Sequence, residues 1–307
     1  MRLTLRQLQV FAAIARHENV SRAADALAMS QSAASSALVE LERQFERPLF
    51  DRIGKSLRLN ATGHGLRPMA ESLLTEAARI EHYLDGNSLE PLSVGATLTI
   101  GNYLATLIMG DYLRESPAAQ LRLHVANTRE IVQQVLSCEL DLGLIEGEAH
   151  DPNLLLTPWL NDQLVVFCAP DHPLARHDAV DNAQLAEQAW IVRESGSGTR
   201  DLIDRMLFSQ LPHYQIRLTL EHTEAIKRAV ESGLGIGCLS RLALREAFRR
   251  GSLVEIPTPQ FTLSRHFYFA QHRQRTLGQG AQRFIALCHA RWDQQEDTTA
   301  LPLPFIP

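Results

Sequence analysis

The sequence predicts an α/β protein with an N-terminal winged helix-turn-helix, a linker helix, and a two-lobed body of doubly wound α/β units. Three observations support this fold class: two helical patterns separated by only two residues, a heptad-like apolar seam, and about 200 residues in which strand and helix patterns alternate. The expected divisions are 1–61 for the head, 62–87 for the linker helix, 88–292 for the body and 293–307 for a C-terminal tail.

The N-terminal segment contains three helical patterns. In residues 4–17 apolar side chains recur at helical spacing, which predicts an amphipathic helix. Ser21 and Ser30 are predicted N-caps of a short alanine-rich helix and of a longer one, and only Ala28 and Met29 separate the two. Helices joined by so short a turn are typical of a helix-turn-helix, although an ordinary helical hairpin has the same pattern.

The start of the longer helix presents short polar side chains, where a helix that only packs more often has Glu and Lys. Amides and hydroxyls of this size reach base edges and phosphates in the major groove. The predicted DNA-reading residues are Gln31, Ser32, Ser35 and Ser36.

Charge and a basic hairpin point in the same direction. The net charge is −5, but residues 1–67 carry +4 and the remainder carries −9, a polarity expected when one module contacts phosphate. After the third helix, RPLFDRIGKSLRLNATGHG alternates around a glycine turn and predicts a two-stranded wing. Its outward basic residues, Arg52, Lys55 and Arg58, are expected to contact phosphates or the adjacent minor groove.

The segment from Leu5 to Gly63 resembles, without a gap, the winged helix-turn-helix of LysR-type transcriptional regulators, including SRAADALAMSQSAASSALVELE and LFDR. Many members have Pro and a bulkier residue where Ser32 is followed by two alanines, so their base preference is not carried over. The resemblance implies a bacterial regulator that binds double-stranded promoter DNA and a small-molecule effector. It also implies homodimers that pair into a homotetramer, and contact with RNA polymerase.

From Thr62 the pattern becomes a longer helix. Its apolar seam is spaced 4, 3, 4, 3, 4 and consists of Leu66, Ala70, Leu73, Ala77, Ile80 and Leu84. Such a seam fits either a helix packed on its own domain or, as the resemblance implies, a linker helix that pairs two chains. Pro68 interrupts the first turns, so the helix is expected to be firm only beyond it.

The body alternates strands with helices, and the resemblance implies a periplasmic-binding-protein-like effector domain. On this resemblance, lobe one takes residues 92–165 and 270–292 and lobe two takes 166–268, and the lobes are joined by crossover strands in QLVVFCAP and SRHFYFAQ. The tail after Trp292 is charged and then Pro-rich and is expected to be loose. Its apolar residues could instead dock: Leu301, Leu303, Phe305 and Ile306.

Ligands of open α/β lobes bind beyond the carboxyl ends of strands, at helix N-termini. Three such points would face one another across the cleft, although each could be an ordinary helix cap. With Glu146 at the end of another strand, the expected effector-binding residues are Thr97, Thr99, Ile100, Gly101, Thr128, Glu146, Ser195, Gly196, Ser197 and Thr199.

Backbone N–H groups and hydroxyls suit a small anion. Glu146 would cap, bind a protonated ligand group, or orient Arg200. VRESGSGTR and EAIKRAVESGLGIGCLSR resemble the family branch that regulates carbon fixation and sulfur assimilation, which favours a sulfur oxyanion such as sulfite or sulfate.

Other classes of protein fit less well. The chain lacks GxSxG, HExxH and GxGxxG motifs, and the four cysteines have no zinc-ligand spacing, so we expect neither an enzyme nor a bound metal or cofactor. No apolar run is long enough for a signal peptide or a membrane span, which predicts a cytoplasmic protein. Two alternatives remain, a redox regulator using Cys138, the one cysteine expected to be exposed, and a DNA-architectural protein without a ligand.

Overall fold

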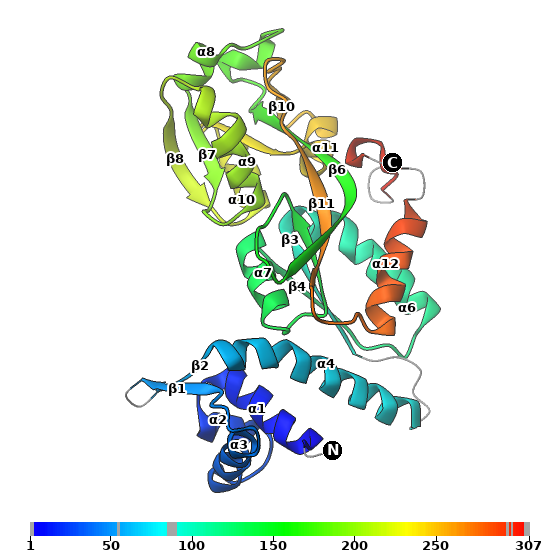
Figure 1. The fold of residues 1–307 in the computed structure, drawn as a ribbon. Coiled ribbons are helices and arrows are strands. Elements are labelled where there is room, and N and C mark those ends of the chain that lie inside the picture. The colour runs from blue at the N-terminus through cyan, green and yellow to red at the C-terminus, as the bar shows by residue number, and fades with distance from the viewer. Residues whose placement is uncertain (1–2, 54–55, 85–90, 293–294, 296, 304–307) are drawn as a thin grey trace.

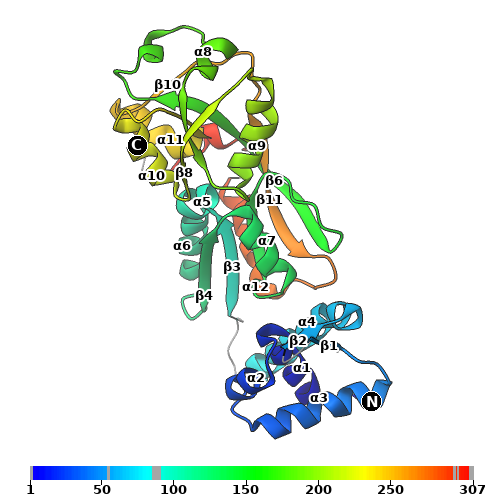
Figure 2. The same cartoon turned by 90° about the vertical axis from the view of Figure 1, so that its left-hand side faces the viewer.

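The computed structural model describes residues 3–53, 56–84, 91–292, 295 and 297–303 (Figure 1). Head, lobe one and lobe two follow one another along the molecule, and the linker helix lies between the head and lobe one (Figures 1 and 2). The expected fold class is confirmed.

The head is built from α1 (Leu5–His17), α2 (Val20–Ala26) and α3 (Gln31–Phe45). Ala23 and Ala24 are fully buried, so α2 is narrow enough for its neighbours to cross it closely. Ser30 caps α3 as predicted, but the cap of α2 is Asn19 rather than Ser21, because Asn19 Oδ1 accepts the Arg22 N–H. The wing is the antiparallel pair β1 (Phe50–Ile53) and β2 (Ser56–Leu59).

The linker helix α4 (Ala61–Leu84) is helical on both sides of Pro68. The expectation that it is firm only beyond this proline is wrong. Asn60 accepts the Gly63 N–H at 2.9 Å, and the first turn packs so closely that a Cβ on residue 63 would lie 2.2 Å from the Leu49 carbonyl oxygen. With Ala70 also buried in the head core, packing outweighs the one hydrogen bond that a proline removes.

Lobe one has a parallel sheet formed by β3 (Leu92–Thr97), β4 (Leu121–Ala126) and β5 (Leu142–Glu146), in the order β4-β3-β5. Side chains of α6 (Thr106–Glu115) and α12 (Gln279–Arg291) pack in one core, and those of α7 (Thr128–Leu136) pack in another, so helices cover both faces (Figure 2). Between β3 and α6 the chain forms the short helix α5 (Leu98–Ile100) and a π-helical turn, η1 (Gly101–Ala105).

Two long strands, β6 (Leu154–Cys168) and β11 (Ser264–His272), run antiparallel through both lobes. The first begins earlier than the QLVVFCAP segment from which it was predicted. Lobe two continues the sheet as β6-β9-β7-β8, with β10 (Val254–Glu255) beside β6. Its strands are β7 (Ala189–Arg193), β8 (Gln215–Leu220) and β9 (Ile236–Ser240), and its helices are α8 (Asn182–Ala186), α9 (Gly198–Met206), α10 (Thr223–Glu231) and α11 (Arg241–Arg250).

The C-terminal segment docks on the body, contrary to the expectation of a loose tail. Thr298–Ala300 forms the short helical turn η4, and Leu301 and Leu303 are 0% and 3% exposed within the core of lobe one. Phe305 and Ile306 lie outside the described residues. Burial of two leucines offsets the entropy cost of ordering the segment.

The linker helix also contacts lobe one. Arg67 Nη2 donates to the Ser137 carbonyl at 2.6 Å, and Arg275 Nη2 donates to Thr75 Oγ1 at 3.2 Å. One helix therefore touches both the head and the body. Within the part of the chain that the structure describes, no helix is both long and apolar enough to cross a bilayer.

Candidate functional site

The first turn of α3 carries the four residues expected to read DNA. Gln31, Ser32 and Ser36 are exposed and Ser35 is half-buried, while Ala34 and Leu38 on the opposite face are buried in the head core. Burial of one face orients the polar face outward, where an α-helix can enter a major groove.

The expected wing residues are described only in part. Arg58 extends from β2 with a side chain that is 65% exposed, and its Nε lies 3.9 Å from Glu18. At such exposure the ion pair is weak, so Arg58 can exchange Glu18 for a phosphate. Arg52 lies on β1, but its side chain, like the whole of Lys55, lies outside the described residues.

The three helix starts of the body meet between the lobes. The Gly198 N–H, at the start of α9 in lobe two, donates to Thr128 Oγ1 in lobe one at 3.2 Å, and the Arg129 N–H donates to the Gly196 carbonyl at 3.1 Å. Thr128 and Ser197 are buried. The cleft is therefore closed around these loops in this structure.

Glu146 lies at the centre of this closed cleft. It is 2% exposed; its Oε1 accepts the Thr99 N–H at 2.6 Å, and its Oε2 lies 2.8 Å from Arg265 Nη1. Thr199 Oγ1, from lobe two, donates to the same Oε2 at 3.4 Å. Burial alone would raise the pKa of the Glu146 carboxyl, but Arg265 and Arg193 outweigh it and hold this pKa below its ordinary value. The carboxylate is thus ionised and bound as an anion.

Arg265 and Asp162 complete the site and escaped the sequence analysis. Arg265 Nε donates to Asp162 Oδ2 at 2.9 Å, and both side chains are buried. The signal was present: Asp162 shares the inward parity of Leu160 and Leu164 on β6, and Arg265 that of Phe267 on β11. A charged side chain at an inward position needs a partner of opposite charge. Here Asp162 of β6 and Arg265 of β11 are partners of each other.

Other expected effector residues have structural partners. Thr97 Oγ1 lies 3.5 Å from the Leu144 carbonyl and also contributes a hydrogen bond to the Glu146 carboxylate, while Ile100 and Gly101 are buried. Ser195 is exposed, with its Oγ 3.5 Å from Arg129 Nη2.

The suggestion that Glu146 orients Arg200 is wrong. Arg200 Nε instead donates to Asp204 at 2.8 Å, one turn along α9. The arginine that pairs with Glu146 is therefore Arg265, on the crossover strand β11.

The cysteines contribute little to the candidate functional site. All four cysteines are buried, including Cys138, which was expected to be exposed. Burial and the nearby Glu71 carboxylate raise the pKa of Cys138 to about 12.

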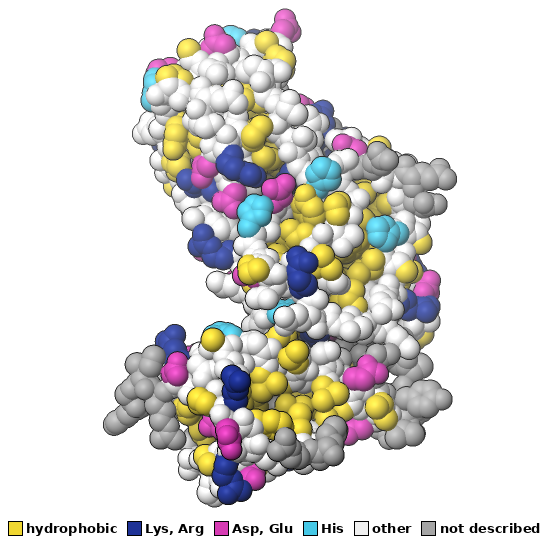
Figure 3. Space-filling view, in the orientation of Figure 1, with side chains coloured by type: hydrophobic (Ala, Val, Ile, Leu, Met, Phe, Trp, Pro, Cys, Tyr) yellow, Lys and Arg dark blue, Asp and Glu magenta, His cyan; other side chains and the backbone are white. Residues whose placement is uncertain are grey.

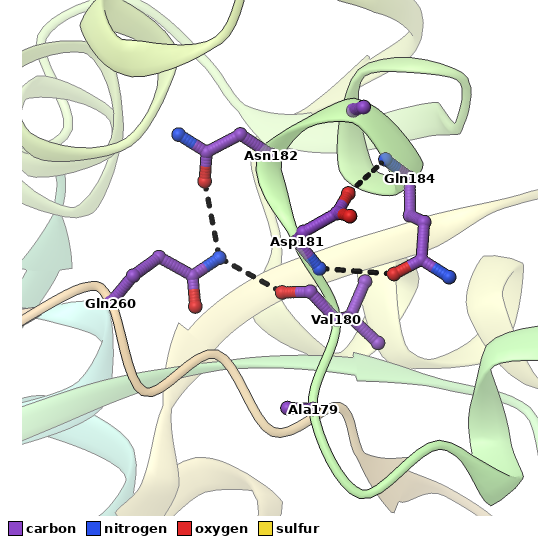
Figure 4. A pocket seen from close by; sticks show the side chains of 7 residues that line it. Ala179, Val180, Asp181, Asn182, Gln184 and Gln260 are labelled. Atoms are coloured by element: carbon purple, nitrogen blue, oxygen red, sulfur yellow. Dashed lines mark hydrogen bonds between the residues drawn. The ribbon is translucent and has the colours of Figure 1, made fainter.

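A surface hollow of about 560 Å³ lies beside α8, and polar groups of its lining bond one another: Gln260 Nε2 donates to the Val180 carbonyl and to Asn182 (Figure 4).

Comparison with known proteins identifies both parts of the chain. Residues 5–64 match the family model "Bacterial regulatory helix-turn-helix protein, lysR family", and residues 86–293 match "LysR substrate binding domain". The chain is 42% identical over 289 residues (94% of this chain, 98% of the relative) to the uncharacterized HTH-type transcriptional regulator YeiE of Escherichia coli K12. It is 33% identical over 288 residues (92% and 95%) to a RuBisCO operon transcriptional regulator of Allochromatium vinosum.

The crystal structure of ArgP from Mycobacterium tuberculosis has the same fold. Its TM-score is 0.75 at 17% sequence identity, and the match covers 95% of this chain and 98% of that one. The helix-turn-helix of the head and the two-lobed α/β body agree with the two family models. The chain belongs to the LysR family of DNA-binding transcriptional regulators, which are not enzymes.

Proposed function

We propose that this regulator responds to a small oxyanion, such as sulfite or sulfate, that binds in the cleft between the lobes. One observation carries the proposal: donors from lobe one, lobe two and a crossover strand converge on a single carboxylate, that of Glu146. A set of donors that holds one buried anion suits another anion of similar size.

The guanidinium of Arg265 retains donor capacity. Its Nη2 lies 2.8 Å from Asp162 Oδ2 but without hydrogen-bond geometry, and it has no other hydrogen-bond partner. Buried donors in this state are rare, and a bound ion or water is one of the ways in which such a donor is satisfied. An oxyanion with several acceptor atoms would use this donor together with the Thr99 N–H.

The Glu146 carboxylate would then compete with the oxyanion for the same hydrogen-bond donors. A bound oxyanion would displace its carboxylate from the Thr99 N–H or from Arg265, because two anions repel within a buried site. Since Thr199 of lobe two also bonds this carboxylate, displacement changes the contacts between the lobes. Effector binding would thereby shift the angle between the lobes and the geometry of the paired heads.

Titration of the full-length protein with a panel of anions tests the proposal: sulfite, sulfate, thiosulfate, phosphate, nitrate and acetate. The wild type should bind one of them selectively, with a rise in melting temperature that follows mass action. Glu146→Gln should bind anions about tenfold more tightly, because the competing charge is gone. Weaker binding by this variant would indicate a ligand with a protonated group, and absence of any anion shift in either protein would remove the proposal. Thr199→Val should weaken binding, whereas Ser209→Ala, in the short helical turn Phe208–Gln210 that follows α9, should not.

On the DNA side, we propose that Gln31, Ser32, Ser35 and Ser36 read the major groove, while Arg52, Lys55 and Arg58 contact phosphates or the minor groove. Dimers would form through α4, where Met69, Leu73 and Ile80 are 60%, 44% and 56% exposed. Figure 3 shows apolar side chains gathered over the head and α4. Pairing of dimers into tetramers, and contact with RNA polymerase, complete the proposal.

A further inference from the structure

The C-terminal segment reaches the same buried network from the crossover strands β6 and β11, which form the hinge between the lobes. Asp297 forms a β-bridge with Asn161 of β6, which places the next residue, Thr298, against the crossover strands. Thr298 is 0% exposed, and its Oγ1 donates to Asp162 Oδ1 at 2.8 Å. The buried hydroxyl of Thr298 thus donates its hydrogen bond to a carboxylate of the hinge.

Asp162 in turn holds Arg265. Its Oδ1 accepts from both Thr298 and Ser240, and its Oδ2 accepts from Arg265 Nε at 2.9 Å. The other edge of the same guanidinium reaches Glu146. A continuous run of contacts therefore links the C-terminal segment to the Thr99 N–H: Thr298, Asp162, Arg265, Glu146, Thr99.

The segment also joins the two lobes on this side. Leu301 and Leu303 belong to the core of lobe one, together with Leu242 of α11. Arg245, also on α11 in lobe two, donates from Nη1 to the Leu301 carbonyl. A segment anchored in one lobe and bonded to a helix of the other resists a change of the angle between them.

We propose that residues 297–303 form a strap across the hinge, and that Thr298 is a positioning residue that, through Asp162, aims Arg265 into the effector cleft. This inference rests on the proposed anion site for its ligand. The strap sets the affinity for the oxyanion through Asp162, from the edge of the Arg265 guanidinium that faces away from Glu146. Removing the Thr298 hydroxyl leaves Asp162 with one donor fewer, so the carboxylate and the guanidinium that it holds gain freedom.

The test compares three single substitutions in the full-length protein. Thr298→Val removes the hydroxyl and keeps the shape, Thr298→Ser restores the hydroxyl, and Thr299→Val changes the exposed neighbour on the same turn. Sulfite and sulfate are titrated by calorimetry. Thr298→Val should weaken binding about three- to tenfold, while Thr298→Ser and Thr299→Val bind as the wild type does. A variant that lowers the melting temperature but leaves the dissociation constant unchanged would make Thr298 merely structural and overturn the proposal.

Hydrogen exchange supplies a readout that needs no ligand. The Thr99 amide is protected by Glu146, so Thr298→Val should speed its exchange about tenfold relative to Thr299→Val. If the wild type binds no anion while this acceleration is seen, the anion site fails and the strap stands. If anions bind and neither affinity nor exchange responds to Thr298→Val, the strap fails and the anion site stands.

Discussion

A Cβ atom on residue 198 would lie 1.9 Å from the carbonyl oxygen of Glu146, so only glycine at this position lets lobe two approach lobe one as closely as it does. Gly198→Ala should therefore force the lobes apart, at a cost of about 1–3 kcal/mol. The expected drop in melting temperature is about 3–10 °C, with an increase in the radius of gyration measured by X-ray scattering. Gly110→Ala, in an open position within α6, is the control: it should leave the radius unchanged and should not lower the melting temperature, because alanine favours a helix interior over glycine. An unchanged radius in Gly198→Ala would mean that the cleft absorbs the methyl group locally.

Base reading and phosphate contact should separate by mutation. Gln31→Ala should weaken operator binding by about 1–3 kcal/mol and relax sequence preference, whereas Arg58→Ala should weaken binding to all sequences alike. Loss of one phosphate contact should also reduce the slope of log K against log salt by about 0.9. Fluorescence anisotropy with operator and scrambled duplexes at several salt concentrations measures all three effects. If both variants respond in the same way, the division between α3 and the wing is wrong.

The exposed apolar row on α4 should carry the dimer. Leu73→Glu introduces a charge among apolar side chains that two chains would share, and the dimer should dissociate at concentrations at which the wild type remains paired. Sedimentation velocity gives the dissociation constant. Met206→Glu, at a comparably exposed apolar position on α9, should leave it unchanged. A stable Leu73→Glu dimer would place the interface elsewhere.

The lowered pKa of Glu146 predicts how stability depends on pH. Because the folded pKa lies below the unfolded value of about 4.3, the unfolded chain binds the proton more readily. The stabilisation is therefore present above that value and is lost as pH falls through the folded pKa. Denaturant unfolding at pH 7, 4 and 3 should show the advantage of the wild type over Glu146→Gln shrinking at the two acidic values. A constant gap between the wild type and Glu146→Gln over this range would contradict the prediction.

Cys138 should be inert in the folded protein. With its thiol buried and its pKa about 12, very little thiolate is present at pH 8. Alkylation by iodoacetamide should be slow until denaturant is added, as mass spectrometry of the Cys138 peptide would show. Cys138→Ala should keep wild-type DNA binding in the presence of peroxide. Rapid alkylation of the native protein would revive a thiol-based response.

The sequence predicts the fold and half of the candidate site. Helical spacing and strand parity are local, which is why the helix-turn-helix and the βα alternation could be read from them. Glu146 and Thr199 were also within reach, since they follow strands. The inward strand position of Arg265 is also a local signal, but its pairing with Asp162 is not, because the two residues lie 103 positions apart in the chain. Pro68 shows the same limit from the other side, since tertiary packing of α4 overrides a local helix breaker.

The two contacts that fasten α4 to lobe one join residues 70 and 200 positions apart in sequence. A helix of 24 residues is a rod about 36 Å long, and this one shares the head core with α3 through Ala70. Both contacts with lobe one and the contact of Ala70 with the head lie between residues 67 and 75, a stretch of about 12 Å along the helix axis. Lobe one and the head therefore hold the same part of α4, so a rotation of lobe one that carries this part of the helix with it would turn the head as well.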